Sequence, residues 1–203
     1  MTLSVPPSAI TALVGVNGSG KSTLFRIAAG FVRPTSGRID MPHFSARVAL
    51  RYLNQNPRCL YGLSTLDNLK TALYPYLSTE AICDLLATLR LTYLLGEKPA
   101  AMPKVSVTLL HLAAAFMAEP AFLIADEPFA GLDRAAAAHV SSVLRAMAER
   151  GIGVLVSDHN AALILNLASG IHIMKSGRIV YQGTPAEARA SADASKLYFR
   201  THA

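Results

Sequence analysis

The stretch that decides the fold is residues 15–23, which read Gly15-Val16-Asn17-Gly18-Ser19-Gly20-Lys21-Ser22-Thr23. This spacing is typical of a phosphate-binding loop, because glycines allow consecutive backbone N–H groups to surround an anionic phosphate. Lys21 can reach the β- and γ-phosphates, and the Ser22 hydroxyl can ligate Mg²⁺. An apolar run at 10–14 predicts a strand before the loop, and residues 22–29 predict a helix whose N-terminus points at the phosphates. We therefore expect a nucleoside triphosphate as substrate, the alternative being a glycine-rich turn that binds nothing. The predicted nucleotide-binding residues are Gly15, Asn17, Gly18, Ser19, Gly20, Lys21, Ser22 and Thr23.

The composition is that of a globular domain. Of the 203 residues, 52% are hydrophobic and 16% are charged, which is enough for a buried core and unlike a disordered chain. The net charge of +6 suits an anionic ligand or a membrane surface, although it also fits an ordinary basic protein. Cys59 and Cys83 form no C-x-x-C motif, which argues against a disulfide framework or zinc site. No signal peptide is visible, and no apolar run reaches the ~18 residues of a membrane helix.

The order of apolar and amphipathic segments predicts an α/β fold, with a mainly parallel sheet flanked by helices and a small inserted helical subdomain. The predicted strands are 10–14, 48–53, 121–125, 153–157 and 171–174. Residues 134–150 predict a helix ended by Gly151, and Ser176-Gly177 predicts a hairpin turn. Between 57 and 105, leucine-rich helices are expected at 66–73 and 79–95, with Ser64 and Asp67 as the first helix's capping pair. The alanine-rich tail after Pro185 predicts one further helix.

Two carboxylates follow the apolar run at 121–125. Asp126 and Glu127 are expected at the C-terminal end of a core strand, where α/β sheets bind ligands. Asp126 is placed to hold Mg²⁺, and Glu127 to polarise the attacking water. The alternative, a helix cap at the end of the strand, needs one carboxylate at most.

Two further polar residues follow predicted strands. His159 comes two residues after the strand at 153–157 and can hydrogen-bond the γ-phosphate. Gln55 comes two residues after the strand at 48–53, and its neutral amide can contact Mg²⁺ or the water. Each is a weak indication alone, since a lone histidine is usually a surface or core residue, but together with the loop they form a consistent set.

With these residues in place, the chain resembles the ABC-type ATPase family, the nucleotide-binding subunits of membrane transporters. Residues 15–23 match the Walker A motif, Gln55 the Q-loop, 122–127 the Walker B motif, 130–133 the D-loop and His159 the switch histidine. Short strings at 157–160 and 183–187 are most similar to the lipopolysaccharide-export and branched-chain amino acid transport branch. The resemblance implies ATP and Mg²⁺ as cofactors, with Glu127, His159 and Gln55 catalytic and with Ser22, Gln55 and Asp126 around the metal.

The resemblance also implies the organisation and the partners. It predicts one ABC-type domain over 1–203, with 1–56 and 106–203 as the P-loop core and 57–105 as the helical subdomain. It predicts transmembrane permease subunits and a second ATP-binding subunit as partners, no nucleic acid, and a cytoplasmic location on the inner face of the membrane. We expect residues 60–76, with Gln55, to meet the permease, the alternative being ordinary packing of the subdomain.

Two departures from the family pattern bear on activity. The signature motif Leu-Ser-Gly-Gly-Glu is replaced at its ungapped position by Met102-Pro103-Lys104-Val105-Ser106, and a slip of one turn would make Ser106 the contacting serine. The chain also has no aromatic residue or histidine before Phe25 to stack on adenine, and residues 2–5 match the strand before the loop strand. The altered signature favours a second hypothesis, a catalytically weak or regulatory subunit that needs a partner with an intact signature, whereas the intact Glu127 and His159 favour hydrolysis. A chromosome-type ATPase of related fold is disfavoured because no long coiled-coil insertion is present.

Overall fold

One six-stranded sheet organises the chain in the computed structural model, which describes residues 1–41, 48–73 and 77–194. The strand order is β2-β3-β4-β1-β5-β6; the first five run parallel, and β6 pairs antiparallel with β5. This confirms the predicted α/β fold with a mainly parallel sheet. The strands are β1 (Ile10–Val14), β2 (Val48–Leu53), β3 (Pro120–Asp126), β4 (Gly153–Ser157), β5 (Gly170–Lys175) and β6 (Arg178–Gly183).

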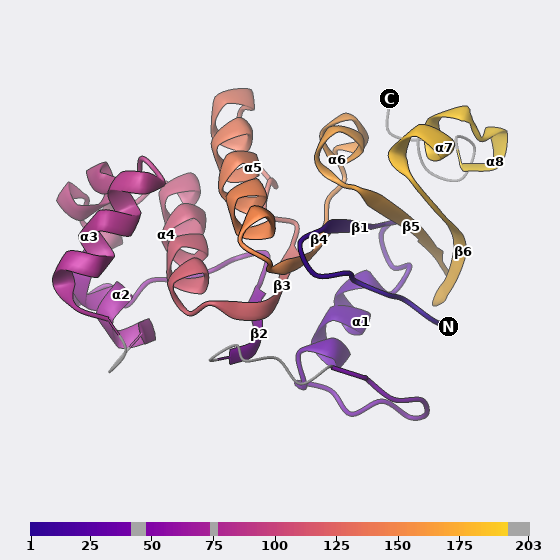
Figure 1. Ribbon diagram of the computed structural model, residues 1–203, viewed down its shortest axis with the longest axis horizontal. Helices are drawn as coiled ribbons and strands as arrows, with labels where there is room; N and C mark the ends of the chain where they lie inside the picture. The colour runs from indigo at the N-terminus through magenta and orange to yellow at the C-terminus, as the bar shows by residue number, and fades with distance from the viewer. Residues whose placement is uncertain (42–47, 74–76, 195–203) are drawn as a thin grey trace.

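Helices cover both faces of the sheet (Figure 1). Side chains alternate between the faces, because successive residues of a strand point in opposite directions. Leu13, Ile124 and Leu155 pack with buried Phe25 of α1 (Lys21–Ala28) on one face. Ala12, Ala125 and Val156 belong to the larger core on the other face, which the remaining long helices line. The central strands are thus buried on both sides, as their continuous apolar sequences predict.

The other helices lie in two groups along the chain. Residues 57–105, the expected helical subdomain, contain α2 (Thr65–Leu73), α3 (Thr79–Thr88) and two 3₁₀ turns, η1 (Thr92–Gly96) and η2 (Pro99–Ala101). After them come α4 (Lys104–Met117), α5 (Arg134–Glu149), α6 (Ala161–Leu167), α7 (Pro185–Ala190) and α8 (Ala192–Ala194). Among the described residues, no helix combines the length and apolar character needed to cross a membrane.

Three sequence expectations need correction. The helix expected over 79–95 ends at Thr88, because Arg90 adopts a left-handed conformation at φ 57° and buried Leu91 bonds back to the Leu86 carbonyl. In the described part of the tail, up to residue 194, there are two short helices rather than one, with the break at Ser191. Residues 2–5 form no strand. Residues 74–76, between the two helices expected at 66–73 and 79–95, lie outside the described residues.

Candidate nucleotide-binding and catalytic site

The predicted site residues lie at one edge of the sheet. Strands β1, β2, β3 and β4 run parallel, so their carboxyl ends meet at the same edge. The glycine-rich loop follows β1, Gln55 follows β2, Glu127 follows β3 and His159 follows β4. Parallel pairing therefore gathers polar residues that are far apart in the sequence.

The loop between β1 and α1 is built on two glycines. A Cβ on Gly15 would lie 2.2 Å from the Met174 carbonyl oxygen, so only glycine fits there. Gly20 adopts φ 107°, which side-chain-bearing residues rarely adopt, and it directly precedes α1. The β5–β6 hairpin turn contacts the loop, because the Gly177 N–H donates to the Ser19 carbonyl at 2.9 Å. The sequence analysis placed this turn but missed its contact with the loop.

Lys21 points into the loop. Its Nζ donates to the Gly15 carbonyl at 2.7 Å and to the Val16 carbonyl at 3.3 Å, and the residue is only 5% exposed. Burial lowers the pKa of Lys21, while the nearby Glu127 and Asp126 carboxylates act in the opposite direction. The ammonium group is thus held at the loop by carbonyl oxygens and by two negative charges.

Glu127 joins the two residues expected to assist it. Its Oε1 lies 2.6 Å from His159 Nε2, and its Oε2 accepts a hydrogen bond from Gln55 Nε2. Glu127 itself has φ 50°, a strained conformation for a residue other than glycine. The structure therefore brings Gln55, Glu127 and His159 together in one hydrogen-bonded group.

Asp126 is held by two residues that the sequence analysis did not assign to the site. Its Oδ1 accepts from Ser157 Oγ at 2.7 Å, and its Oδ2 accepts from Tyr52 OH at 3.3 Å. Burial raises the pKa of Tyr52, and the Asp126 charge adds to the shift. Ser157 ends the apolar β4 and pairs with Asp126 in the β3–β4 register. A polar residue at the end of a buried strand is the sequence signal that could have assigned Ser157 to the site.

The site suits a triphosphate and a hard cation. Gly15 sits where a Cβ would be blocked, and Ser19 Oγ is buried with no hydrogen-bond partner. Asp126 and Ser22 offer the oxygen ligands that Mg²⁺ prefers. The described residues contain no cluster of three or more metal-ligating His, Cys, Asp or Glu side chains. Mg²⁺ is usually held by one or two side chains together with the phosphates of the substrate, and Asp126 and Ser22 are side chains of that kind.

The residues at the signature position adopt a different arrangement. Pro103 is the N-cap of α4 and makes no side-chain capping bond. Ser106 is 2% exposed, and its hydroxyl donates to Glu97 Oε1 at 3.0 Å. Ser106 is therefore engaged inside its own subunit rather than displayed on the surface, while Pro103 and Lys104 are exposed.

Comparison with known proteins gives a consistent result. A family model described as ABC transporter matches residues 1–130. A probable ABC transporter ATP-binding protein of Azorhizobium caulinodans is 32% identical, over 98% of this chain and 75% of its own length. The lipopolysaccharide export system ATP-binding protein LptB of Acidithiobacillus ferridurans is 31% identical, over 92% of this chain and 83% of its own length. A solved structure of an ATP-binding subunit of an ABC transporter superposes with TM-score 0.83 at 27% identity, covering 98% of this chain and 90% of that one. The resemblance read from the motifs is confirmed: the chain belongs to the ABC transporter family, among its ATP-binding subunits.

Proposed function

We propose that this ATP-binding subunit hydrolyses ATP in a Mg²⁺-dependent reaction at the carboxyl edge of the sheet. The observation that carries the proposal is the hydrogen-bonded group of Glu127, His159 and Gln55 beside the phosphate-binding loop. Family membership supports ATP binding and hydrolysis in general, and the residue roles below are specific to this chain.

Each group of residues in the site has its own role in the reaction. Backbone N–H groups of residues 15–23 and the Lys21 ammonium bind the phosphates, and Ser22, Asp126 and Gln55 are the residues to hold Mg²⁺. A Mg²⁺ ion held by these residues would supply positive charge to balance that of the phosphates. Glu127 accepts a proton from, or orients, the attacking water, and His159 donates to the γ-phosphate. Because His159 contacts Glu127 directly, the same histidine can align the carboxylate and the phosphate.

We expect the permease to bind an exposed loop that follows Gln55 in the chain. Leu60, Tyr61 and Leu63 are 54%, 62% and 38% exposed, although they are large and apolar. Asn68 fixes this loop, because its amide donates to the Leu60 and Ser64 carbonyls and its Oδ1 accepts from the Leu60 N–H at 2.7 Å. An exposed apolar loop that is rigidly held favours docking over internal packing. Tyr74 and Tyr76 of the expected surface lie outside the described residues.

We expect a photo-cross-linking residue at Tyr61 to capture a membrane chain in native membranes. The matched control is the same substitution at Tyr93, which is 47% exposed in η1. Mass spectrometry of the cross-linked product identifies the partner. A Tyr61 probe that captures only this chain, or captures nothing beyond the Tyr93 control, contradicts the proposed docking surface.

The altered signature residues bear on which second ATP-binding subunit this chain pairs with. In the family, the signature serine and glycine N–H groups contact the γ-phosphate held by the opposite subunit, so ATP lies between two subunits. Here Pro103 has no N–H to donate, Val105 carries a Cβ, and Ser106 is bonded to Glu97. Two copies of this chain would present the altered residues at both sites. A different partner with an intact signature would complete the site formed by residues 15–23, Asp126, Glu127 and His159.

We expect the isolated chain to hydrolyse ATP slowly, and the triple variant Pro103→Ser, Lys104→Gly and Val105→Gly to hydrolyse it faster. Phosphate release is measured for both proteins with Mg²⁺ and with a chelator, and the triple variant carrying Lys21→Ala serves as the inactive control. If the wild-type protein without a partner already hydrolyses ATP at ~1 s⁻¹ or faster, a rate typical of working enzymes, and the triple variant is no faster, the pairing proposal is contradicted. A triple variant with no Mg²⁺-dependent hydrolysis contradicts the assigned reaction.

The alternative of a purely regulatory subunit rests on the same altered residues. Glu127, His159 and Gln55 are all present and in contact, which favours catalysis by this chain within a suitable pair. We place the protein on the cytoplasmic face of the membrane, bound through permease subunits, because transport coupling requires that contact. The division into a core (1–56 and 106–203) and a helical subdomain (57–105) stays part of the proposal, and no nucleic-acid partner is proposed.

A further inference from the structure

We propose that Ser157 is a positioning residue for both carboxylates of the site: its hydroxyl orients Asp126 for Mg²⁺, and its hydroxyl and carbonyl oxygens hold the backbone of Glu127. The inference rests on the proposed function, which assigns Mg²⁺ to Asp126 and water activation to Glu127. None of the family motifs read from the sequence gives Ser157 such a role.

The contact with Asp126 is short and shielded from solvent. Ser157 is 0% exposed and Asp126 is 4% exposed, so protein groups rather than water supply most of the hydrogen bonds that this carboxylate needs. Ser157 Oγ donates to Asp126 Oδ1 at 2.7 Å, a distance typical of a charge-assisted bond. The one hydroxyl proton of Ser157 is thus committed to Asp126, which fixes the rotation of the carboxylate.

The contact with Glu127 acts on the backbone. The Glu127 N–H donates to the Ser157 carbonyl at 3.0 Å and to Ser157 Oγ at 3.2 Å. Glu127 has φ 50°, and such a conformation persists only where surrounding contacts over-determine it. The Ser157 hydroxyl therefore donates to the Asp126 carboxylate and accepts from the Glu127 N–H, which couples the orientation of the Asp126 carboxylate to the position of the Glu127 backbone.

Removal of the Ser157 hydroxyl is expected to weaken Mg²⁺ binding. Residues that hydrogen-bond a metal ligand typically affect metal affinity by about 10- to 100-fold. Tyr52 contacts the other oxygen of Asp126 at the longer distance of 3.3 Å and does not bond to Glu127. Ser157→Ala should therefore raise the Mg²⁺ concentration for half-saturation by about tenfold, and Tyr52→Phe should raise it less.

The experiment titrates Mg²⁺ into the protein mixed with a non-hydrolysable ATP analogue and follows nucleotide binding by calorimetry. The variants are Ser157→Ala, Ser157→Cys, which keeps a side chain of similar size with a weak donor, and Ser157→Thr, which keeps the hydroxyl. Ser169→Ala is the control for loss of a serine hydroxyl, because Ser169, directly before β5, donates its Oγ to the Ile10 carbonyl at 3.0 Å, away from the carboxylates. Nucleotide affinity in a chelator and the melting temperature without nucleotide are measured for each variant.

We expect a raised Mg²⁺ requirement for Ser157→Ala and Ser157→Cys, restoration toward the native value in Ser157→Thr, and no change in Ser169→Ala. Affinity for the nucleotide in the chelator should stay within twofold of native. A folded Ala or Cys variant with the native Mg²⁺ requirement overturns the role of Ser157. A wild-type protein whose nucleotide binding ignores Mg²⁺ overturns the proposed metal role of Asp126 instead, so the two failures are distinguishable.

Discussion

Replacing Lys21 with alanine should reduce ATP affinity at least tenfold, a loss of about 1.4 kcal/mol or more in binding free energy. Lys21 is buried in the loop, and its Nζ donates to the Gly15 and Val16 carbonyls. No other cation sits within this loop, so its removal leaves the phosphates without a charged donor. Isothermal calorimetry with ATP measures the dissociation constant directly.

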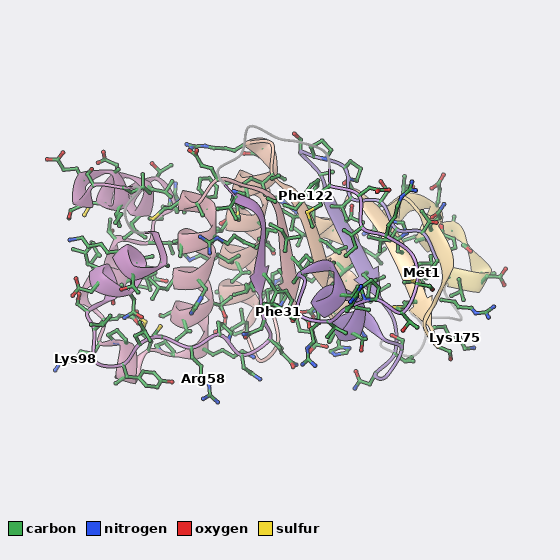
Figure 2. The ribbon with its side chains drawn as sticks, turned by 90° about the horizontal axis from the view of Figure 1, so that it is seen from below. Met1, Phe31, Arg58, Lys98, Phe122 and Lys175 are labelled. Carbon is green, nitrogen blue, oxygen red and sulfur yellow. The ribbon has the colours of Figure 1, made fainter. Side chains whose placement is uncertain are left out.

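The control for Lys21→Ala is Lys98→Ala. Lys98 is exposed and lies at the far end of the molecule from the loop (Figure 2). The Lys98 variant should bind ATP as the native protein does, although it loses the same net charge. Melting temperatures of both variants separate a binding defect from unfolding, because Lys21 also satisfies the Gly15 carbonyl. A folded Lys21→Ala protein with an unchanged dissociation constant refutes the assignment of the loop.

Replacing Glu127 with glutamine should leave ATP binding intact and lower the rate of hydrolysis by at least ~100-fold, the usual scale of general-base catalysis. The amide has the size of the carboxylate and can still accept one of the two bonds from Gln55 and His159, but it cannot take a proton. Phosphate release and the ATP dissociation constant are measured together. Because the isolated chain is expected to be slow, the comparison is made in the triple variant at positions 103–105.

Glu149→Gln is the charge-matched control for this change, since Glu149 ends α5 as an exposed residue. It should leave hydrolysis unchanged. If Glu127→Gln hydrolyses ATP as fast as the background protein, Glu127 does not activate the water, and another group must do so. If Glu127→Gln instead loses ATP binding, the carboxylate is a structural element of the loop rather than a catalytic one.

Local sequence predicted the strands well, because their signal is local. The bounds of β1, β2 and β4 coincide with those read from the sequence, and a glycine or polar residue (Gly15, Asn54 or Asp158) directly follows each of them. The loop was equally predictable, since Gly15, Gly20 and Lys21 serve a chemistry that few other residues can serve. Their spacing along the chain already determines their arrangement in space.

Other features depend on contacts that local sequence does not encode. Arg90 ends α3 in a left-handed conformation where glycine is usual, and burial of Leu91 rather than a local signal stabilises that turn. Ser157 acts on Asp126 only because β3 and β4 are adjacent in the sheet. The bond between Ser106 and Glu97 likewise requires the residue after the turn at 92–96 to lie against α4. The sequence alone therefore could not decide whether Ser106 serves as the signature serine.

The position of β1 in the sheet constrains how the chain folds during synthesis. β1 is made first, yet its two neighbours are β4 and β5, with Ile10 opposite Val154 and Thr11 opposite Gly170. The Met174 carbonyl that packs on Gly15 and the Gly177 N–H that holds Ser19 come later still. A nascent chain from which residues 15–23 and β3 have already emerged therefore still lacks a complete nucleotide pocket. The nucleotide can act as a ligand that stabilises the fold only after the residues through Gly177 have left the ribosome, and until then the apolar β1 depends on slow, long-range pairing.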